Sequence, residues 1–399
     1  TPREVERSFA VCNRCPDQVD EGCASPKGCP AGLPVNRLAT LTMDEGGFGG
    51  YGAYEAARLA VNNNPLLLAG AQACDPCQAQ QGCRNAVSRA GIQIQDMHAR
   101  LAEHYVDHKD QFPRPEITPN GKKVAVIGDG PSAIVTALHL AASGTEVTIF
   151  SKTGKLGGLM DMIPRIGDAQ ASINEMMASF PNIKVVKDDH ANPERDWKAE
   201  GFDGVVVGAG LVYCLPEDVY FPEGHKDQQH AVDFIAAHQS DETSLKGKRV
   251  MIVGGGKTAV DAALLAQQRG AEVEVCYRRD IGSMKEYKEL VDAGITIKPF
   301  LKPVSSAEAA EGGSFVMFNV TKLAEGGAKT DGKRLVRATG EDERRTADLI
   351  LWATPGVRNP EWQRLKDEAV IPVELVGDLV ERNNTVAHAV GSGRKGALA

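Results

Sequence analysis

The sequence predicts an α/β fold with two doubly wound domains, the second inserted in the first, preceded by an all-α domain that carries most of the cysteines. Three observations predict it. Two strand–glycine loop–helix–strand segments of the same design occupy 122–150 and 247–279. Short apolar runs at 202–210 and 347–356 end in further glycine turns. Seven of the nine cysteines lie before residue 84, where no strand pattern is visible.

Composition and charge narrow the possible functions. The 399 residues suffice for two or three domains. A net charge of −8 lacks the basic excess of nucleic-acid-binding proteins, so we expect no nucleic-acid partner. No run of about 18 apolar residues occurs and the first residues lack the apolar part of a signal peptide, so we expect no membrane span. Nine cysteines without a secretory signal indicate a reducing, cytoplasmic compartment.

Residues 1–110 are expected to form the small helical domain. Apolar residues at helical spacing predict one helix in YEAARLAVNNN, which Pro65 ends, and another in IQDMHARLAEHYVDHKDQF. Prolines and a glycine make 111–122 a linker. The apolar runs that follow predict the parallel strands of the two α/β domains.

The first glycine loop follows an apolar strand, opens a helix and reads Gly128-Asp129-Gly130-Pro131-Ser132-Ala133. In this G-x-G-x-x-A pattern Gly128 permits a tight turn, Gly130 lets a pyrophosphate approach the backbone, and Ala133 lets the helix pack on the strand. The helix N-terminus offers N–H groups and a dipole to phosphates. A plain glycine turn is the alternative, but the complete strand–loop–helix–strand setting favours a Rossmann-like dinucleotide site.

The acidic residue that should hold the ribose is missing from this unit. An Asp or Glu ordinarily ends the second strand and binds the ribose hydroxyls. Here the strand runs into Ser151 and Lys152. We expect Ser151 to bind the ribose as a neutral partner, or Lys152 to meet a phosphate instead.

The second loop repeats the pattern as Gly254-Gly255-Gly256-Lys257-Thr258-Ala259. Its second strand ends in CYRR, which places Arg278 and Arg279 where an acid would select NAD. Arginine there accommodates a 2′-phosphate, whereas a solvent-exposed strand end is the structural alternative. We therefore expect NAD(P)H, with a slight preference for NADPH.

The clustered thiols indicate a metal centre, and seven of them occur: Cys12, Cys15, Cys23, Cys29, Cys74, Cys77 and Cys83. Two C-x₂-C pairs suit zinc, but one four-ligand site would leave three thiols over. The Cys-Pro step at residue 29 and the tight spacing are typical of ferredoxin-like ligation. Two iron–sulfur clusters are favoured, with zinc or structural thiols as alternatives. Cys214 and Cys276 lie in apolar, strand-like surroundings and are expected in the core.

The order of motifs resembles a known family. A cysteine-rich helical domain is followed by the first glycine loop, GKLGGLMDMIPR, GGGKTAVD, YRRD and GDLV. This order resembles the small, FAD- and NAD(P)H-binding iron–sulfur subunit of bacterial glutamate synthase, and the N-terminal part of dihydropyrimidine dehydrogenase is similar. Similar chains are the nicotinamide-linked subunits of 2-oxoacid oxidoreductases such as phenylglyoxylate dehydrogenase. The resemblance covers nearly the whole chain and is specific for the module rather than for its partner.

The resemblance implies FAD, NAD(P)H and two [4Fe–4S] clusters as cofactors. It implies that one cluster is held by Cys12, Cys15, Cys23 and a non-cysteine side chain on the following helix, matched here by His98, with Gln95 and Asp96 as neighbours. It assigns the other cluster to Cys29, Cys74, Cys77 and Cys83. The gaps after Cys15 and Cys23 are longer than in the family, which leaves the partition of the ligands open.

The resemblance also implies flavin contacts from several segments: Gly157, Gly158, Leu159, Gly208, Gly377, Asp378 and the helix that begins at Thr385. The N-terminal dipole of that helix favours the negative charge of a reduced flavin. The implied domains are 1–110 for iron–sulfur, 111–122 as linker, 123–246 and 347–399 for FAD, and 247–346 for NAD(P).

The implied function is an electron-transfer subunit, which moves electrons between NAD(P)(H), FAD and two clusters to or from a partner catalytic subunit. The partner would belong to a 2-oxoacid:acceptor oxidoreductase or a glutamate-synthase-like complex. The cofactors carry the hydride chemistry, so no catalytic side chain is assigned. A thioredoxin-reductase-like enzyme would need a C-x-x-C pair beside the flavin, but Cys276 stands alone. A free-standing NAD(P)H dehydrogenase and a zinc-bearing, nucleotide-binding interaction module are the alternatives.

Overall fold

The computed structural model describes most of the chain, namely residues 29–44, 51–73, 93–112, 116–162, 169–187, 191–221, 227–238, 243–284, 286–324, 329–330, 333–381 and 385–399. Six of the cysteines predicted as cluster ligands lie outside these residues: Cys12, Cys15, Cys23, Cys74, Cys77 and Cys83.

The chain divides into two compact units. Unit 1 comprises Thr1–Leu211 and Arg358–Ala399, and unit 2 comprises Val212–Val357 between them. The inserted unit is longer at both ends than the predicted 247–346. The reason is strand pairing, because the strands at 228–230 and 349–352 hydrogen-bond into the sheet of unit 2.

The described residues before the first sheet are helical. They form α2 (Val35–Asp44), α3 (Tyr51–Asn63), α4 (Leu67–Ala73), α7 (Ile94–Asp107) and the 3-10 turn η2 (Lys109–Gln111). The two helices predicted from apolar spacing are confirmed as α3 and α7. Small residues on α3 and larger ones on α7 are buried against each other in what we call the N-terminal helix core, which includes Ala56, Ala60, Met97 and Leu101.

The sheet of unit 1 has five parallel strands in the order β15-β4-β1-β2-β3. Its elements are β1 (Lys123–Ile127), α8 (Pro131–Ala142), β2 (Glu146–Ser151), η3 (Gly158–Met162), α9 (Ala169–Ala178), β3 (Ile183–Lys187), β4 (Gly204–Val207), α13 (Pro360–Glu368), β15 (Val373–Leu375), η7 (Gly377–Leu379) and α14 (Val386–Leu398). The predicted strand–helix–strand segment is confirmed. Because β4 and β2 flank β1, the first glycine loop lies at the switch point of the sheet, where such folds bind ligands.

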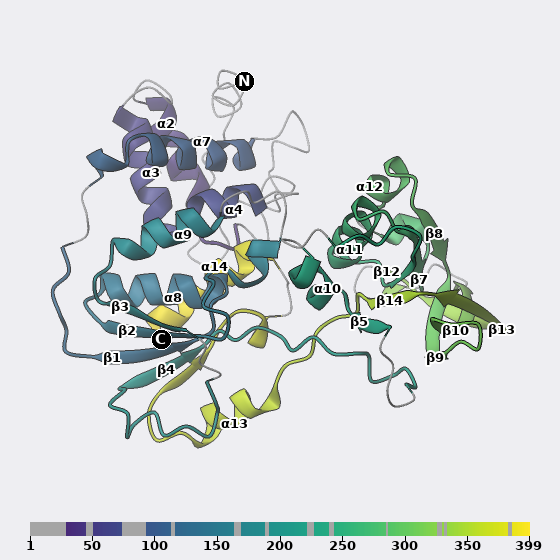
Figure 1. Ribbon diagram of the computed structural model, residues 1–399. Helices are drawn as coiled ribbons and strands as arrows, with labels where there is room; N and C mark the ends of the chain where they lie inside the picture. The colour runs from purple at the N-terminus through teal and green to yellow at the C-terminus, as the bar shows by residue number, and fades with distance from the viewer. Residues whose placement is uncertain are drawn as a thin grey trace. The chain divides into compact units, whose positions relative to one another are not determined.

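Alternate residues of β1 face two different cores. Val126 packs with α8, α9 and Val390 of α14 in what we call the α8–α14 core, which also includes Leu66, just before α4, and Ala69 of α4. Figure 1 shows α8 and α14 together on this face of the sheet. Ala125 and Ile127 point to the opposite face, where Trp197 and other side chains cover the sheet.

The sheet of unit 2 repeats this arrangement with five parallel strands in the order β5-β14-β6-β7-β8. Its elements are β5 (Gln228–His230), α10 (Ala231–His238), β6 (Arg249–Val253), α11 (Lys257–Gln268), β7 (Glu272–Tyr277), η5 (Ile281–Ser283), α12 (Tyr287–Asp292), β8 (Thr296–Pro299) and β14 (Leu349–Trp352). The strand–helix–strand segment predicted at 247–279 is confirmed as β6–α11–β7.

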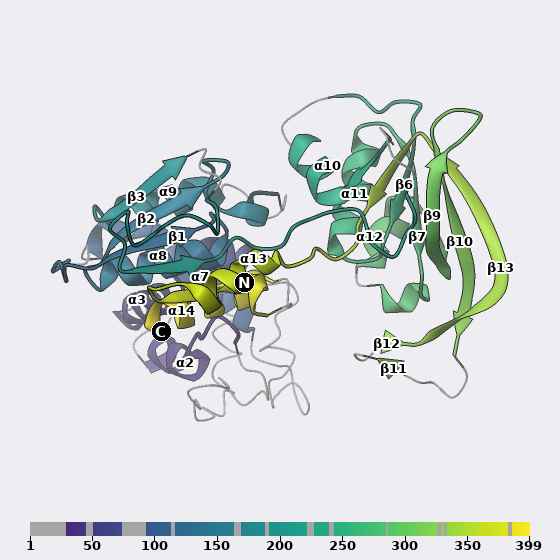
Figure 2. The same cartoon turned by 90° about the horizontal axis from the view of Figure 1, so that it is seen from below.

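Unit 2 contains an antiparallel sheet that the sequence patterns did not indicate. It consists of β9 (Leu301–Glu308), β10 (Ser314–Leu323) and β13 (Val336–Ala347), and a short hairpin of β11 (Lys329–Thr330) and β12 (Lys333–Arg334) lies between β10 and β13 in the chain. Figure 2 shows this sheet on one side of the parallel strands, with α10, α11 and α12 on the other. Val316 and Phe318 pack on Trp352 between the sheets. Half of the twelve residues of β13 are charged and seven are exposed, so the strand lacks an apolar pattern.

Two expectations about single features can be compared directly with the structure. No helix of the described residues is long and apolar enough to cross a membrane. Cys276 is fully buried on β7, as predicted, and burial raises the pKa of its thiol. Cys214 is only half-buried, because it lies in an irregular segment rather than in a strand.

Candidate functional site

The first glycine loop is held at the carboxyl end of β1. Gly128 has a φ of +107°, and a Cβ placed there would lie 2.5 Å from the carbonyl oxygen of Gly208. Its N–H donates to the Phe150 carbonyl oxygen at 3.0 Å. Only glycine combines this backbone conformation with such a close approach. Gly128, which was predicted to permit a tight turn, thus lies against Gly208, the residue directly after β4.

The space beside Gly130 is open. Gly130 is the N-cap of α8, Pro131 is its first residue, and no atom of the described segments lies within 4 Å of the position of a Cβ on Gly130. Ser132 and Ala133 are buried and let α8 pack closely on the strands. Free backbone N–H groups at a helix N-terminus beside an open glycine make an anion site. These residues fit the pyrophosphate of a dinucleotide.

Three further predicted flavin contacts meet at this loop. A Cβ on Gly158 would lie 2.9 Å from Gly130 Cα, and the Gly157 N–H donates to the Asp129 carbonyl oxygen at 2.7 Å. A Cβ on Gly377, whose φ is +68°, would lie 2.5 Å from Ser132 Oγ. The structure thus brings residues predicted from three separate motifs into one cradle around the N-terminus of α8. Leu159, the next residue, is 39% exposed beside them.

The loop around Asp378 is fastened by a residue that sequence reasoning missed. Arg358 donates from Nε to the Asp378 carbonyl oxygen at 3.2 Å and from Nη2 to the Val380 carbonyl oxygen at 2.6 Å. Arg358 lies outside every motif, and only its position after the glycine turn of residue 356 could have suggested a role. Thr385 is the N-cap of α14, and its side chain accepts the His388 N–H.

Ser151 does not stand alone at the end of β2. It is fully buried, and its hydroxyl donates to Asp129 Oδ2 at 2.7 Å. The sequence reading assigned the ribose contact to Ser151 and gave no role to Asp129, although Asp129 is the middle residue of G-D-G. Lys152 follows on the surface and is exposed.

The second loop repeats the geometry of the first. Gly254 has a φ of +146°, and a Cβ there would lie 2.4 Å from the Ala353 carbonyl oxygen. Gly256 is the N-cap of α11, and in the part of the chain that the structure describes no atom lies within 4 Å of its Cβ position. Ala259 is buried. Thr258 lies half-buried in the first turn of the same helix. Unit 2 therefore offers a second phosphate cradle of the same kind.

Lys257 of unit 2 is held by carboxylates, whereas Arg278 and Arg279 follow the end of β7. Lys257 Nζ lies 2.7 Å from Glu286 Oε2 and 3.1 Å from Asp261 Oδ1. Burial lowers the pKa of Lys257, but the two carboxylates outweigh it, so the pKa is raised and the side chain stays an ammonium. Arg278 is exposed beyond the end of β7 and Arg279 is half-buried.

Of the predicted cluster ligands, two lie in the described residues. His98 on α7 is 4% exposed, and its Nε2 lies 3.4 Å from Asn64 Nδ2. Burial lowers the pKa of His98 to about 4, so the imidazole is neutral, the form that binds metals. Cys29 is half-buried. Within the described ranges no three His, Cys, Asp or Glu side chains gather as a metal site.

A comparison with protein families identifies the family of this chain. The model described as pyridine nucleotide-disulphide oxidoreductase matches residues 122–362, more than half of the chain. The chain belongs to this family. As a pyridine nucleotide-disulphide oxidoreductase it is an FAD-dependent NAD(P)H oxidoreductase, and the two glycine cradles are the parts of its fold that suit the two dinucleotides.

Curated relatives confirm the resemblance found in the sequence. The chain is 27% identical over 359 residues to the NAD-dependent dihydropyrimidine dehydrogenase subunit PreT of Escherichia coli K12, covering 86% of this chain and 83% of the relative. It is 25% identical over 394 residues to the glutamate synthase [NADPH] small chain of the same strain, covering 86% and 82%.

Solved structures support the fold alone. Thioredoxin reductase of T. acidophilum matches with a TM-score of 0.51 and 17% identity, covering 69% of this chain and 97% of that one. The chain spans less than half the length of the larger enzymes that share its fold.

Proposed function

We propose that this oxidoreductase is a cytoplasmic electron-transfer subunit, which moves electrons between NAD(P)(H), FAD and two [4Fe–4S] clusters to or from a partner catalytic subunit. When bound, FAD would supply the chemistry that links two-electron hydride exchange with the nicotinamide to single-electron exchange with the clusters. The partner is a 2-oxoacid:acceptor oxidoreductase or a glutamate-synthase-like enzyme. The names of the relatives, a dehydrogenase subunit and a synthase small chain, support the subunit role.

The observation that carries the proposal is the position of Cys29. It packs against both the N-terminal helix core and the α8–α14 core, so it joins the helical part of unit 1 to the proposed flavin domain. The next residue continues this contact, because a Cβ on Gly391 of α14 would lie 1.9 Å from the Pro30 carbonyl oxygen. Arg394 of α14 also donates to the Gly32 carbonyl oxygen at 3.4 Å.

Helix α14 links this cysteine segment to the flavin cradle. Its Gly393 packs against the Ser132 backbone, where a Cβ would lie 2.3 Å from the Ser132 carbonyl oxygen. Thr136 bridges the two helices, since its hydroxyl lies 2.9 Å from the carbonyl oxygens of both Ser132 and Gly393. Gly391 follows the N-cap Thr385 by about 9 Å of helix at 1.5 Å per residue. A cluster held by Cys29 would thus sit about two helical turns or less along α14 from Thr385.

The chain's own residues are assigned binding and orienting roles. The N-termini of α8 and α11 receive pyrophosphates, and the open sides of Gly130 and Gly256 admit them. Gly157, Gly158, Gly377 and Asp378 line the flavin side. Cys29 with Cys74, Cys77 and Cys83 is proposed to hold one cluster, and Cys12, Cys15, Cys23 and His98 the other. Ordered thiolate and imidazole ligands set the potentials at which the clusters exchange electrons.

The test is anaerobic purification followed by cofactor analysis of three proteins: wild type, Cys29→Ser and Cys214→Ser. We expect one FAD and about eight irons per wild-type chain, and about four irons in Cys29→Ser with FAD retained. Cys214→Ser is the matched control, because Cys214 is a half-buried thiol of unit 2 outside both assigned ligand sets. A wild-type protein with FAD but no iron would support the free-standing dehydrogenase, and zinc in place of iron would support the interaction module.

Nucleotide preference and partner are tested separately. We expect Arg278→Gln and Arg279→Gln each to lower the NADPH-to-NADH ratio of kcat/KM by about tenfold, since arginine binds a phosphate bidentately. Unchanged ratios would argue for NADH and a solvent-exposed strand end. Co-purification from native cells should yield a larger catalytic subunit, whereas a lone monomer would contradict the subunit role.

A further inference from the structure

The two units can be aligned residue by residue at their nucleotide loops. Gly128 N–H donates to the Phe150 carbonyl oxygen at 3.0 Å, and Gly254 N–H donates to the Cys276 carbonyl oxygen at the same distance. One residue further, Ser151 ends β2 and Tyr277 ends β7. Dinucleotide folds carry their ribose-binding Asp or Glu at this strand end. Neither unit has an acid there.

In unit 1 a carboxylate reaches this strand end from the glycine loop. Asp129 Oδ2 accepts the Ser151 hydroxyl at 2.7 Å and the Thr153 hydroxyl at 3.2 Å. The direction of the first bond is fixed, because Ser151 Oγ already accepts the Gly154 N–H at 2.8 Å and so has its own proton to give. The hydroxyl of Ser151 is therefore engaged, and the group presented at the strand end is the Asp129 carboxylate.

The second unit shows that the loop itself does not require this aspartate. Gly255 occupies the position of Asp129, and a Cβ on Gly255 would lie 2.3 Å from Cδ2 of the Tyr277 ring. The aromatic ring fills the space that the Asp129 side chain occupies in unit 1. Unit 1 therefore has Asp129 with Ser151 at these two equivalent positions, whereas unit 2 has Gly255 with Tyr277.

The remaining oxygen of Asp129 is available. No hydrogen bond to Oδ1 occurs within the part of the chain that the structure describes, and this oxygen lies 3.7 Å from a Cβ position on Gly158, where glycine leaves space. A carboxylate close to a pyrophosphate is repulsive, but the two hydroxyl donors fix Asp129 at the strand end. There it suits a neutral donor, as the vicinal hydroxyls of a ribose are.

We infer that Asp129 is the residue that recognises the adenosine ribose of FAD, in place of the acid missing from the end of β2. Ser151 and Thr153 are positioning residues, which aim the carboxylate. The inference rests on the proposed FAD occupancy of unit 1. It also implies selection against a 2′-phosphorylated adenosine at this loop, because a phosphate would meet the negative carboxylate.

The test is a binding cycle on full-length protein stripped of flavin, with flavin fluorescence as the readout. The ligands are FAD and two analogues that lack the 2′- or the 3′-hydroxyl of the adenosine ribose. We expect Asp129→Asn to weaken FAD binding by about 10- to 100-fold, the effect of a hydrogen bond to a charged group. One of the deoxy analogues should bind wild type equally weakly and be nearly indifferent to the substitution. Ser151→Ala keeps the carboxylate and should retain discrimination against that analogue.

A double variant distinguishes the loss of ribose recognition from a folding defect. Asp129→Ala combined with Ser151→Glu returns the acid to the strand end and should restore the discrimination against the deoxy analogue, with thermal unfolding checked in parallel. Equal losses for FAD and both analogues in Asp129→Asn would show that Asp129 only clamps Ser151 and would overturn the inference. A wild-type protein that binds no FAD would instead overturn the proposed function.

Discussion

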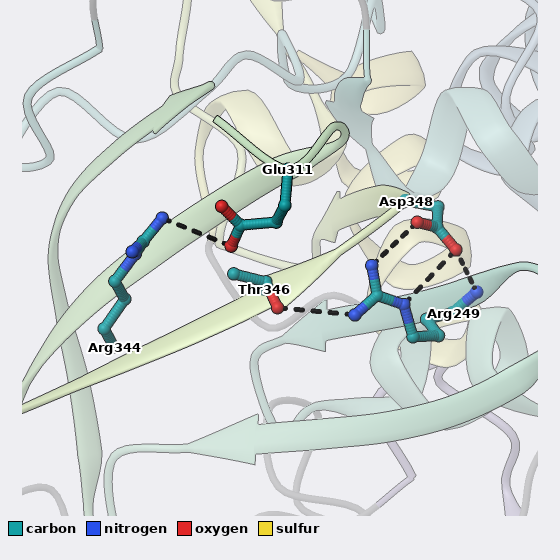
Figure 3. A network of polar contacts seen from close by, with 5 residues as sticks. All are labelled: Arg249, Glu311, Arg344, Thr346 and Asp348. Carbon is teal, nitrogen blue, oxygen red and sulfur yellow. Dashed lines mark hydrogen bonds and ion pairs between the residues drawn. The ribbon is translucent and has the colours of Figure 1, made fainter. Parts of the chain in front are cut away.

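Asp348 holds Arg249 through both its backbone and its side chain. Asp348 Oδ2 accepts the Arg249 backbone N–H at 2.8 Å and Oδ1 accepts Arg249 Nη2 at 2.9 Å (Figure 3). In addition, the Asp348 N–H donates to the Arg249 carbonyl oxygen at 2.9 Å. These bonds fix the register of β14 beside β6, so that Ala353 comes to lie over Gly254. Asp203 and Lys123 make the same backbone exchange beside β1, at 2.8 and 2.7 Å. In both units, therefore, an aspartate on the neighbouring segment pairs with the first residue of the strand that leads into the nucleotide loop.

Asp348→Asn should destabilise unit 2 by about 1 kcal/mol, measured as a shift of the urea midpoint. Arg249 lowers the pKa of Asp348 through a side-chain hydrogen bond. A lowered carboxyl pKa contributes stability above the unfolded value of about 3.9 and loses it as pH falls through the folded pKa. The difference between variant and wild type should therefore shrink in acid.

The control for this prediction is the neighbouring pair in Figure 3, Glu311 and Arg344 at 3.5 Å, which are exposed. Glu311→Gln should cost less than about 0.5 kcal/mol. Equal effects of the two substitutions would contradict a special role for Asp348.

The glycines of the first loop should separate folding from binding. Gly128→Ala places a Cβ 2.5 Å from the Gly208 carbonyl oxygen at a residue with positive φ. We therefore expect the free energy of unfolding to fall by about 2 kcal/mol or more and FAD binding to be lost as well. Gly130→Ala meets no atom within 4 Å and should cost under about 1 kcal/mol, yet weaken FAD at least tenfold by filling the pyrophosphate space. Thermal unfolding and flavin titration measure the two effects. Full FAD affinity in Gly130→Ala would be inconsistent with a phosphate at this position.

Lys257 is predicted to contribute little to nucleotide binding as long as its two carboxylate partners are present. Glu286 and Asp261 already neutralise the ammonium, so Lys257→Met should change the Kd of NADP⁺ by no more than about twofold. Glu286→Gln frees the ammonium for a phosphate and should tighten binding about two- to fivefold. Calorimetric titration measures both, with Asp261→Asn as a milder parallel. A large loss in Lys257→Met would mean that the side chain leaves Glu286 to bind the nucleotide.

His139 should make unit 1 sensitive to mild acid. Burial lowers the pKa of His139 from 6.5 to about 4, with Arg394 contributing, and its buried Nε2 has no hydrogen-bond partner among the residues that the structure describes. Below pH 6.5 this histidine is protonated in the unfolded chain but stays neutral in the folded protein. The free energy of unfolding therefore decreases as the pH is lowered from 6.5 to about 4. His139→Gln should remove on the order of 2 kcal/mol of this pH dependence. An unchanged pH profile of the unfolding midpoint would rule out this source.

Local patterns were sufficient for the nucleotide loops. The helix that the first glycine loop opens was predicted, because Pro131 is well suited to the first position of a helix. Gly128 and Gly377 contact residues that are distant in the chain, Gly208 and Ser132 respectively, and in the structure both have a positive φ that favours glycine.

Other features depend on pairing between distant segments. The exposed, charged strand β13 has little apolar periodicity of its own, and it is a strand because β10 offers it partners. The inserted unit of the structure is longer than the predicted NAD(P) domain for the same reason. Strands β5 and β14 lie outside the predicted bounds but pair into the sheet of unit 2.

The sequence by itself determined that two strand–glycine–helix cradles exist and that thiols gather before them, because turn geometry and residue chemistry act over a few neighbouring positions. Only the tertiary structure decided that Asp129 meets Ser151, that Lys257 is held by Glu286, and that Cys29 lies between two cores. Those relationships are distances between residues that chain separation does not fix, and they arise when buried surfaces pack.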